Sequence, residues 1–228
     1  MSSFDVHQAI GDVLAFAVVV AVSPINIMAA ILLLFSARPI AGAAAYLAGF
    51  TAGVAVVLVA LELVAAHLDL SNGSGPSRAA AILRIVLGVA LVVAAVRKVN
   101  KRRAATGDGE LPGWMNGISE FAPPKAAGTG LLIGALNPKN LAMAVAASLV
   151  IGAASLSAGQ TATVIVVYVV VASLGVAAPL ALTLVLGDRS TAILTEWRAW
   201  LGRNNDAVMA VIYLLFGVVL VGKGIAAL

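Results

Sequence analysis

The 228-residue sequence contains no cysteine. This excludes disulfide bonds, thiolate metal sites and a dithiol redox relay, so the chain is not a thiol-shuttling membrane protein. Charged residues are also scarce, at 11% of the chain, whereas 62% of the residues are hydrophobic. Because a soluble domain of this size cannot bury so much apolar side chain, most of it must face lipid. The composition therefore predicts an integral membrane protein.

Several functional motifs are missing as well. The sequence shows no nucleophile–base pair, metal-ligand cluster, Gly-rich phosphate loop or nucleotide site. We therefore expect a protein that is not an enzyme and that uses no metal or cofactor. The net charge of +4 comes from basic residues in loops between apolar segments, so it is a topology signal and not a sign of nucleic-acid binding. The first twelve residues carry no Lys or Arg, so we interpret the first apolar run as a retained span and not as a cleaved signal peptide.

Six apolar segments are long enough to cross a membrane, which takes about 20 residues of helix. The three loops expected on one side hold ten of the Lys and Arg residues, and the opposite side holds three. This distribution predicts a multi-pass protein of the plasma (inner) membrane, with both termini outside and the basic loops in the cytoplasm. The expected spans cover residues 9–35, 41–66, 79–98, 127–152, 158–186 and 206–227.

Aromatic residues are few, and all three tryptophans fall in two of the basic loops. The spacing of neighbouring apolar residues predicts short interfacial helices there. An aromatic belt at headgroup depth is the main interpretation, and a lateral gate that recruits lipid is the alternative. The residues concerned are Trp114, Ile118 and Phe121 in the third loop, and Ile193, Trp197 and Trp200 in the fifth.

The chain contains an internal repeat. "SPINIMAA" (23–30) aligns without gaps with "NPKNLAMA" (137–144), and Pro24 and Pro138 are 114 residues apart. Weaker matches continue the alignment, with Tyr46 and Tyr168 separated by 122 residues and "LGVALV" (87–92) and "FGVVLV" (216–221) by 129. Because each half holds three spans, the halves must have opposite orientations in the membrane. We predict an all-α integral membrane fold of six transmembrane helices, built as two inverted three-helix repeats with Pro-broken helices 1 and 4.

A single membrane domain follows from this repeat. Its parts are repeat 1 (9–98), a cytoplasmic loop with an interfacial helix (99–126) and repeat 2 (127–228). The Gly49-x-x-x-Gly53 and Gly130-x-x-x-Gly134 motifs fit close helix packing, which we expect inside the protomer and not at a dimer face.

Pro24 and Pro138 each indicate the start of a new half-helix inside the bilayer. Ser23 and Asn137 are good N-caps, and proline suits the first helical position. In two inverted repeats, the positive ends of both half-helices point toward the same central region. Asn26 and Asn140, each two residues after its proline, offer further hydrogen bonds there. The electrostatics favour a substrate with an acidic group.

Lys139 adds a full charge within a span, at a cost of about 2.5–3.5 kcal/mol on insertion scales. Three explanations remain open. Its side chain reaches an interface, it pairs with Glu62, or it awaits the anionic group of a substrate. Glu62 is the only acid well inside a span. It is either a candidate proton-coupling group or an acid that reaches the outer headgroups.

The two three-helix halves, with "SPIN" in helix 1 and "NPKN" in helix 4, resemble the LysE-type exporter superfamily. The basic third loop and the "PGWM" stretch before helix 4 are most similar to its actinobacterial branch, the GAP or sulfolipid-addressing (Sap) proteins. The resemblance implies delivery of glycolipids, such as sulfolipids or glycopeptidolipids, to the mycobacterial cell surface. It also implies a homodimer that works alongside a large lipid-exporting transporter. The substrate-binding positions that these motifs carry over are Ser23, Pro24, Asn26, Asn137, Pro138, Lys139 and Asn140.

Three functions therefore compete. The first is export or addressing of an anionic or glycosylated lipid. The second is proton-coupled export of amino acids or other small anionic solutes. The third is a non-transporting scaffold subunit of a larger lipid exporter.

Overall fold

The computed structural model describes residues 3–67, 78–104, 115, 117–154 and 156–228. Within these residues all regular structure is helical, which confirms the all-α prediction. Trp114 and most of the third loop lie outside the described residues, so the interfacial helix predicted there is visible only as a 3-10 turn. The elements are α1 (Ser3–Ala21), α2 (Pro24–Leu34), α3 (Pro39–His67), α4 (Arg78–Ala104), η2 (Ile118–Glu120), α5 (Pro123–Leu136), α6 (Pro138–Ala153), α7 (Ala158–Leu186), η3 (Gly187–Arg189) and α8 (Ser190–Ile225).

Three of the helical stretches are long and apolar enough to cross a membrane: α3, α4 and the continuous run from α7 through α8. The pair α1 and α2 forms a fourth when it is taken as one span, bent by 54° at its break. α5 and α6 contain 14 and 16 residues, so each alone is shorter than a bilayer crossing. These apolar helices therefore fit a multi-pass helical membrane protein.

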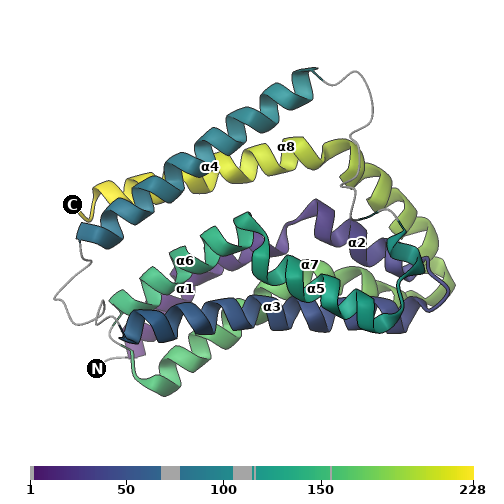
Figure 1. Ribbon diagram of the computed structural model, residues 1–228, viewed down its shortest axis with the longest axis horizontal. Helices are drawn as coiled ribbons and strands as arrows, with labels where there is room; N and C mark the ends of the chain where they lie inside the picture. The colour runs from purple at the N-terminus through teal and green to yellow at the C-terminus, as the bar shows by residue number, and fades with distance from the viewer. Residues whose placement is uncertain (1–2, 68–77, 105–114, 116, 155) are drawn as a thin grey trace.

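The fifth loop differs from the prediction. α7 and α8 are joined only by the 3-10 turn η3, and α8 is a helix of 36 residues. Ile193, Trp197 and Trp200 thus belong to the first turns of α8 and do not form a separate interfacial helix. Figure 1 shows α8 rising at one end of the molecule and then running beside α4. The apolar spacing was read correctly as helical, but the absence of a proline or a glycine run lets this helix continue into the span.

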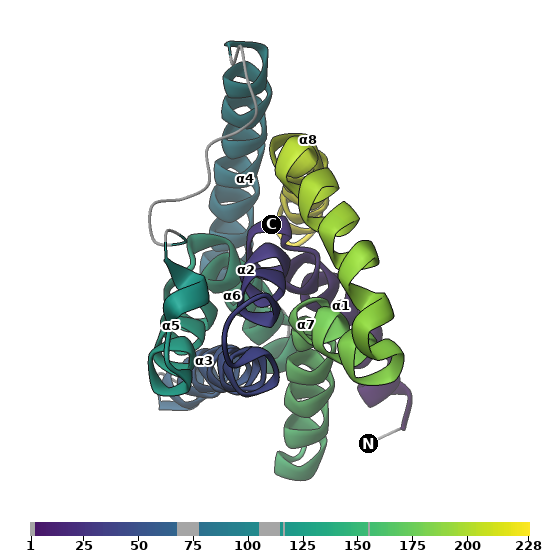
Figure 2. The same ribbon diagram turned by 90° about the vertical axis from the view of Figure 1, so that its right-hand side faces the viewer.

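The helices are arranged in two parts. α4 and the later part of α8 lie side by side and form one layer, whereas the other long helices pack together beneath it (Figures 1 and 2). In the bundle, α3 packs along α5 and α1 packs along α7. The beginning of α1 and the end of α8 lie at the same end of the molecule (Figure 1).

Glycine allows the closest of these contacts. A Cβ atom added at Gly49 would lie 1.9 Å from the carbonyl oxygen of Ala127, and one added at Gly130 would lie 2.2 Å from that of Tyr46. Gly53 and Gly134 meet backbone of the partner helix in the same way. The two Gly-x-x-x-Gly motifs therefore pack against each other within the protomer, as the sequence predicts.

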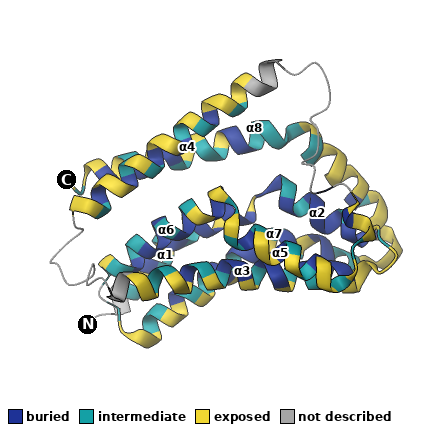
Figure 3. Cartoon of the chain, in the orientation of Figure 1, coloured by how far each residue is buried: buried dark blue, intermediate teal, exposed yellow. Residues whose placement is uncertain are grey.

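Burial separates an inner from an outer surface. The inner faces of α1, α2, α3, α6 and α7 form a continuous apolar core, which includes the fully buried Phe16, Tyr46, Phe50 and Tyr168 (Figure 3). Many large aliphatic side chains of the long helices point outward and are exposed. Soluble monomers rarely expose apolar area on this scale, so these surfaces are suited to contact with lipid.

Candidate functional site

The break between α1 and α2 lies at Ser23, as the sequence predicts. Pro24 is the first residue of α2, and both Ser23 and Pro24 are buried. The Ser23 side chain makes no capping hydrogen bond. Asn26, in the first turn of α2, is 1% exposed, and neither its amide nitrogen nor its amide oxygen has a hydrogen-bond partner. This break therefore holds a buried polar side chain that the fold leaves unsatisfied.

The break between α5 and α6 is capped more completely. Asn137 ends α5 and begins α6, and its side-chain oxygen accepts a hydrogen bond of 3.0 Å from the backbone N–H of Lys139. The amide nitrogen of Asn140 donates to the carbonyl oxygens of Ile133 (3.1 Å) and Gly134 (3.3 Å) in the last turn of α5. Pro138, at the first position of α6, is exposed. Two asparagines thus cap both ends of this break, while the side-chain oxygen of Asn140 is itself buried without a partner.

Lys139 crosses from one break to the other. Its side-chain nitrogen donates to the carbonyl oxygens of Val19 (2.8 Å) and Val20 (3.4 Å), and the residue is only 4% exposed. These carbonyls belong to the last turn of α1, where the break removes their normal helical partners. A cation at a helix C-terminus also interacts favourably with the helix dipole. The ammonium therefore joins α6 to the end of α1.

This contact adds a fourth possibility to the three explanations that the sequence left open for Lys139, and binding of a substrate's anionic group stays a prediction. The hydrogen bonds of its side-chain nitrogen go to α1, which supplies both acceptors, and not to Glu62. The sequence does contain a sign of this contact, because any break in a spanning helix leaves backbone carbonyls without hydrogen-bond partners. Among the described residues, the ion pairs are Lys98–Asp206 and Lys223–Asp12.

Glu62 lies on α3. One of its carboxyl oxygens is buried without a partner. Within the described ranges, no group of three or more His, Cys, Asp or Glu side chains could hold a metal ion.

A small cavity of about 70 Å³ lies beside the breaks, between the broken helices and the α4–α8 layer. It brings together three of the predicted substrate-binding residues, Ser23, Asn137 and Lys139. Asn26, Asn140 and Glu62 do not line it. The remaining lining residues are Ile25, Lys98, Asn205, Met209 and Tyr213. The charge of Lys98 is balanced by Asp206, whose carboxylate oxygen lies 2.6 Å from the lysine nitrogen.

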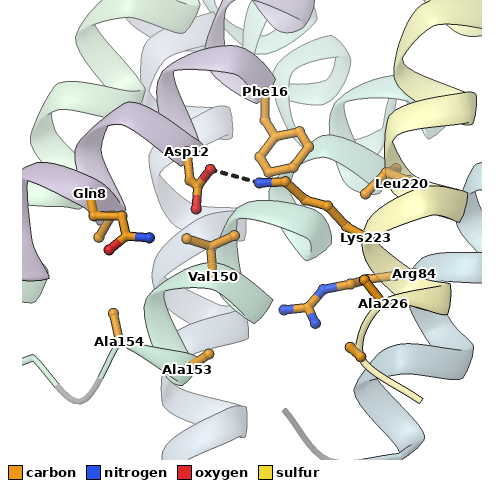
Figure 4. A pocket seen from close by; sticks show the side chains of 12 residues that line it. Gln8, Asp12, Phe16, Arg84, Val150, Ala153, Ala154, Leu220, Lys223 and Ala226 are labelled. Atoms are coloured by element: carbon orange, nitrogen blue, oxygen red, sulfur yellow. Dashed lines mark hydrogen bonds and ion pairs between the residues drawn. The ribbon is translucent and has the colours of Figure 1, made fainter. Parts of the chain in front are cut away.

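A much larger cavity, of about 640 Å³, opens between α1, α4, α6 and α8 (Figure 4). Its volume is in the range that holds small organic ligands. Charged and polar side chains line one part of it and apolar side chains the rest, so the cavity is amphiphilic. The lining residues are Gln8, Ala9, Asp12, Phe16, Arg84, Val150, Ala153, Ala154, Leu220, Lys223, Ala226 and Ala227.

Two cations and one carboxylate give this cavity a net positive charge. The Lys223 side-chain nitrogen lies 2.6 Å from a carboxylate oxygen of Asp12, and these side chains are 42% and 39% exposed. The cavity is therefore open at this side. Arg84 is 8% exposed and donates one hydrogen bond of 3.1 Å to the carbonyl oxygen of Leu149 on α6. Figure 4 shows the Arg84 guanidinium projecting into the cavity between α4 and α6.

Within the described part of the chain, the carbonyl oxygen of Leu149 is the hydrogen-bond acceptor of Arg84. The guanidinium has five N–H donors, and this hydrogen bond uses one of them. A planar guanidinium next to an ammonium, with apolar side chains alongside, can receive an anionic group attached to an apolar body.

The sequence-based prediction missed this cavity. Asp12, Arg84 and Lys223 each lie near a span end, where the sequence indicates only topology. They come from α1, α4 and α8, and nothing in their spacing along the chain links them. Only the packing of the three helices brings them together.

The fold and the cavity define a multi-pass helical membrane protein with an amphiphilic, cationic cavity between its helix layers. The family model of Sap, the sulfolipid-1-addressing protein, matches residues 13–226, and the chain belongs to this family. Neither a curated protein nor a solved structure matches the chain. The family membership confirms the resemblance to Sap proteins and suggests a role in lipid export or addressing.

Proposed function

We propose that this chain exports or addresses a glycosylated or otherwise polar lipid whose headgroup carries a negative charge. The observation that carries the proposal is the cavity between α1, α4, α6 and α8, in which Arg84 and Lys223 face apolar walls. We assign the headgroup to this cavity. The protein moves or presents the lipid without chemical conversion, so we propose that it is not an enzyme.

Charge and shape both favour an anionic headgroup. A sulfate or carboxylate matches the guanidinium fork of Arg84, because two parallel N–H donors meet two oxygens. The attraction is stronger there than at an open surface, since Arg84 is almost fully buried and the effective dielectric constant is lower. Asp12 offsets part of the positive charge and, through Lys223, holds one cation at the cavity opening.

The surroundings favour a lipid over a small solute. α4 and α8, which form one wall, expose apolar side chains along their outer faces, including Val86, Val89, Val218 and Val219. An acyl chain can lie against this surface while the headgroup stays in the cavity. Proton-coupled export of a small anion is the second candidate, and the buried carboxyl oxygen of Glu62 that has no partner is the observation that favours it.

We also propose that the protein has six membrane crossings in two inverted halves. Residues that the repeat makes equivalent contact each other in the structure. The hydroxyl of Thr51 donates to that of Ser173 at 2.9 Å, a separation of 122 residues. A Cβ atom at Gly88 would lie 2.7 Å from the Gly217 carbonyl oxygen, and one at Gly217 would lie 2.8 Å from that of Gly88. Such reciprocal contacts are expected on a two-fold axis.

The proposed orientation gives the cavity a direction. With both termini outside the plasma membrane, the large cavity lies toward the outer surface, because it is lined by the first turns of α1 and the last turns of α8. The small cavity at the breaks then lies deeper along the same α4–α8 layer. We retain the predicted residues of the two breaks as an inner binding region that an anionic headgroup reaches during transfer.

Binding of two matched lipids tests the proposal. The protein is reconstituted in lipid nanodiscs, and binding of sulfatide (3-sulfogalactosylceramide) and of galactosylceramide is measured by native mass spectrometry. The two lipids differ only in the sulfate. We expect the protein to prefer sulfatide by about tenfold, which corresponds to 1.4 kcal/mol.

Single substitutions locate the site. Arg84→Gln and Lys223→Gln should each reduce the preference for sulfatide. Arg97→Gln is the matched control, because Arg97 is exposed on the same helix as Arg84 and does not line the cavity. Equal binding of the two lipids by the wild-type protein contradicts the proposal. If the protein is instead a scaffold subunit, we expect equal binding of the two lipids. We then also expect deletion of residues 105–114 to abolish function.

A further inference from the structure

Asn26 and Asn140 occupy equivalent positions in the two repeated motifs, but the structure uses them differently. Each lies two residues after the proline that starts a half-helix. Asn140 donates to two carbonyl oxygens of the preceding half-helix, those of the residues seven and six positions earlier. Asn26 is as deeply buried as Asn140 and its amide has no partner at all.

The corresponding acceptors for Asn26 are already occupied. The residues seven and six positions before Asn26 are Val19 and Val20. Their carbonyl oxygens accept the two hydrogen bonds of the Lys139 ammonium, at 2.8 and 3.4 Å. Lys139 thus holds the two acceptors that the repeat assigns to Asn26, and this explains why the Asn26 amide is left without a partner.

We propose that Asn26 and Lys139 alternate as the cap of α1, and that Asn26 is a positioning residue for a Lys139 ammonium that binds the acidic group of a ligand. In the structure described here, Lys139 caps α1. When an anionic headgroup enters the small cavity, the ammonium turns to it and the Asn26 amide takes the carbonyls of Val19 and Val20. The nature of the ligand rests on the proposed function, whereas the exchange of caps rests on the hydrogen bonds alone.

The exchange removes the main obstacle to releasing Lys139. Leaving buried carbonyls without donors is costly, so a lysine with no substitute would stay in place. The ammonium has three donors, and its two hydrogen bonds leave one for the cavity that it lines with Ser23 and Asn137. Within the described part of the chain, no carboxylate lies within ion-pair distance of Lys139, so its charge is available to an anion.

The first test needs no ligand. Thermal unfolding in nanodiscs is measured for Asn26→Leu, Lys139→Met and the double variant. Asn26→Leu should leave the Tm unchanged or raise it, because it removes an amide that has no partner. Lys139→Met should be tolerated, because Asn26 then caps α1. In the double variant neither cap remains, so its Tm should fall by more than the sum of the two single shifts.

Asn140→Leu is the matched control for Asn26→Leu. The two residues are equivalent in sequence and both are buried, but only Asn140 donates hydrogen bonds in the structure. Asn140→Leu should therefore lower the Tm. A similar loss of Tm for Asn26→Leu, or additive shifts in the double variant, would overturn the exchange of caps.

The second test uses sulfatide and galactosylceramide in the same nanodiscs. Asn26→Leu should weaken sulfatide binding about tenfold and leave galactosylceramide binding unchanged, because the released carbonyls would find no donor. Asn26→Gln, which keeps an amide, should restore part of the difference. Normal sulfatide preference in Asn26→Leu overturns the link to the ligand. If the wild-type protein itself does not prefer sulfatide to galactosylceramide, the proposed function fails. The Tm comparison still tests whether Asn26 and Lys139 exchange as the cap of α1.

Discussion

Replacing Gly130 with alanine places a methyl group against the backbone of α3. The added Cβ atom would lie 2.2 Å from the carbonyl oxygen of Tyr46 and 2.9 Å from the backbone nitrogen of Phe50. Both atoms belong to the helix backbone and have no flexible end that could move away. Reaching an ordinary contact of 3.4 Å requires α3 and α5 to separate locally by about 1.2 Å.

The cost follows from this separation. Overpacking of a tight interface costs about 1–3 kcal/mol, whereas alanine gains up to about 1 kcal/mol over glycine in a helix. Gly128 offers a matched control two residues away on α5, because a Cβ atom there meets nothing within 4 Å. Gly130→Ala should therefore be destabilising, and Gly128→Ala should be neutral or stabilising.

Unfolding in mixed micelles, followed by tryptophan fluorescence during titration with SDS, measures both variants. The difference between them should be about 1–3 kcal/mol, the cost of overpacking alone, since the gain in helix propensity is common to both variants. Equal stabilities for Gly128→Ala and Gly130→Ala would refute the close approach of α3 and α5. The position of the α5–α6 break, which depends on this packing, would then be wrong as well.

Three further predictions concern single polar contacts. Asp12→Asn removes the carboxylate beside Lys223 and should tighten sulfatide binding in nanodiscs several-fold. The Tm should not change, because the ion pair is exposed. Weaker sulfatide binding would contradict the assignment of the headgroup to this cavity. Thr51→Val removes the hydrogen bond to Ser173 and should cost about 0.6 kcal/mol in the micelle assay, the average for such bonds in membranes. Ser157→Ala removes the capping box of α7 and should cost about 1 kcal/mol in the same assay, and an unchanged stability would show that this helix start does not need its cap.

Much of the fold follows from sequence. Helices cover all six expected segments, and α7 matches its predicted bounds, 158–186, because a serine cap and a glycine delimit it. The breaks at Pro24 and Pro138 were also predictable, since proline, caps and polar neighbours coincide there. In the fifth loop the sequence predicts a short separate helix around residues 193–200 but not its continuation into the span, because polar and charged residues in a loop position give no sign that a helix runs on.

Less of the candidate site could be predicted from the sequence. The sequence identifies Lys139 as a costly charge, but its partner is a pair of backbone carbonyls, which no side-chain pattern reveals. Asn137 forms the cap expected of it, whereas Ser23 does not. Arg84 and Lys223 converge only through tertiary packing, so the large cavity could not be predicted. Periodicity and capping are local properties, and cavities depend on contacts between distant segments.

The roles of the two cationic regions differ in the structure. Lys139 is enclosed and satisfies the end of α1, so it contributes to the architecture of the breaks. Arg84 and Lys223 line the larger cavity, and in the proposed function an arriving headgroup meets them first. The proposed exchange of caps connects the two regions, because it allows the enclosed lysine to take over an anion from the outer cavity.

Profiling of surface lipids tests the central claim most directly. The gene is deleted in its own organism, and the surface lipids are compared after complementation with the wild type, Arg84→Gln or Arg97→Gln. We expect the deletion to deplete one anionic lipid at the surface, the wild type and Arg97→Gln to restore it, and Arg84→Gln to fail. A surface lipid profile unchanged by the deletion would contradict lipid export or addressing, and full rescue by Arg84→Gln would contradict the assignment of the headgroup to this cavity.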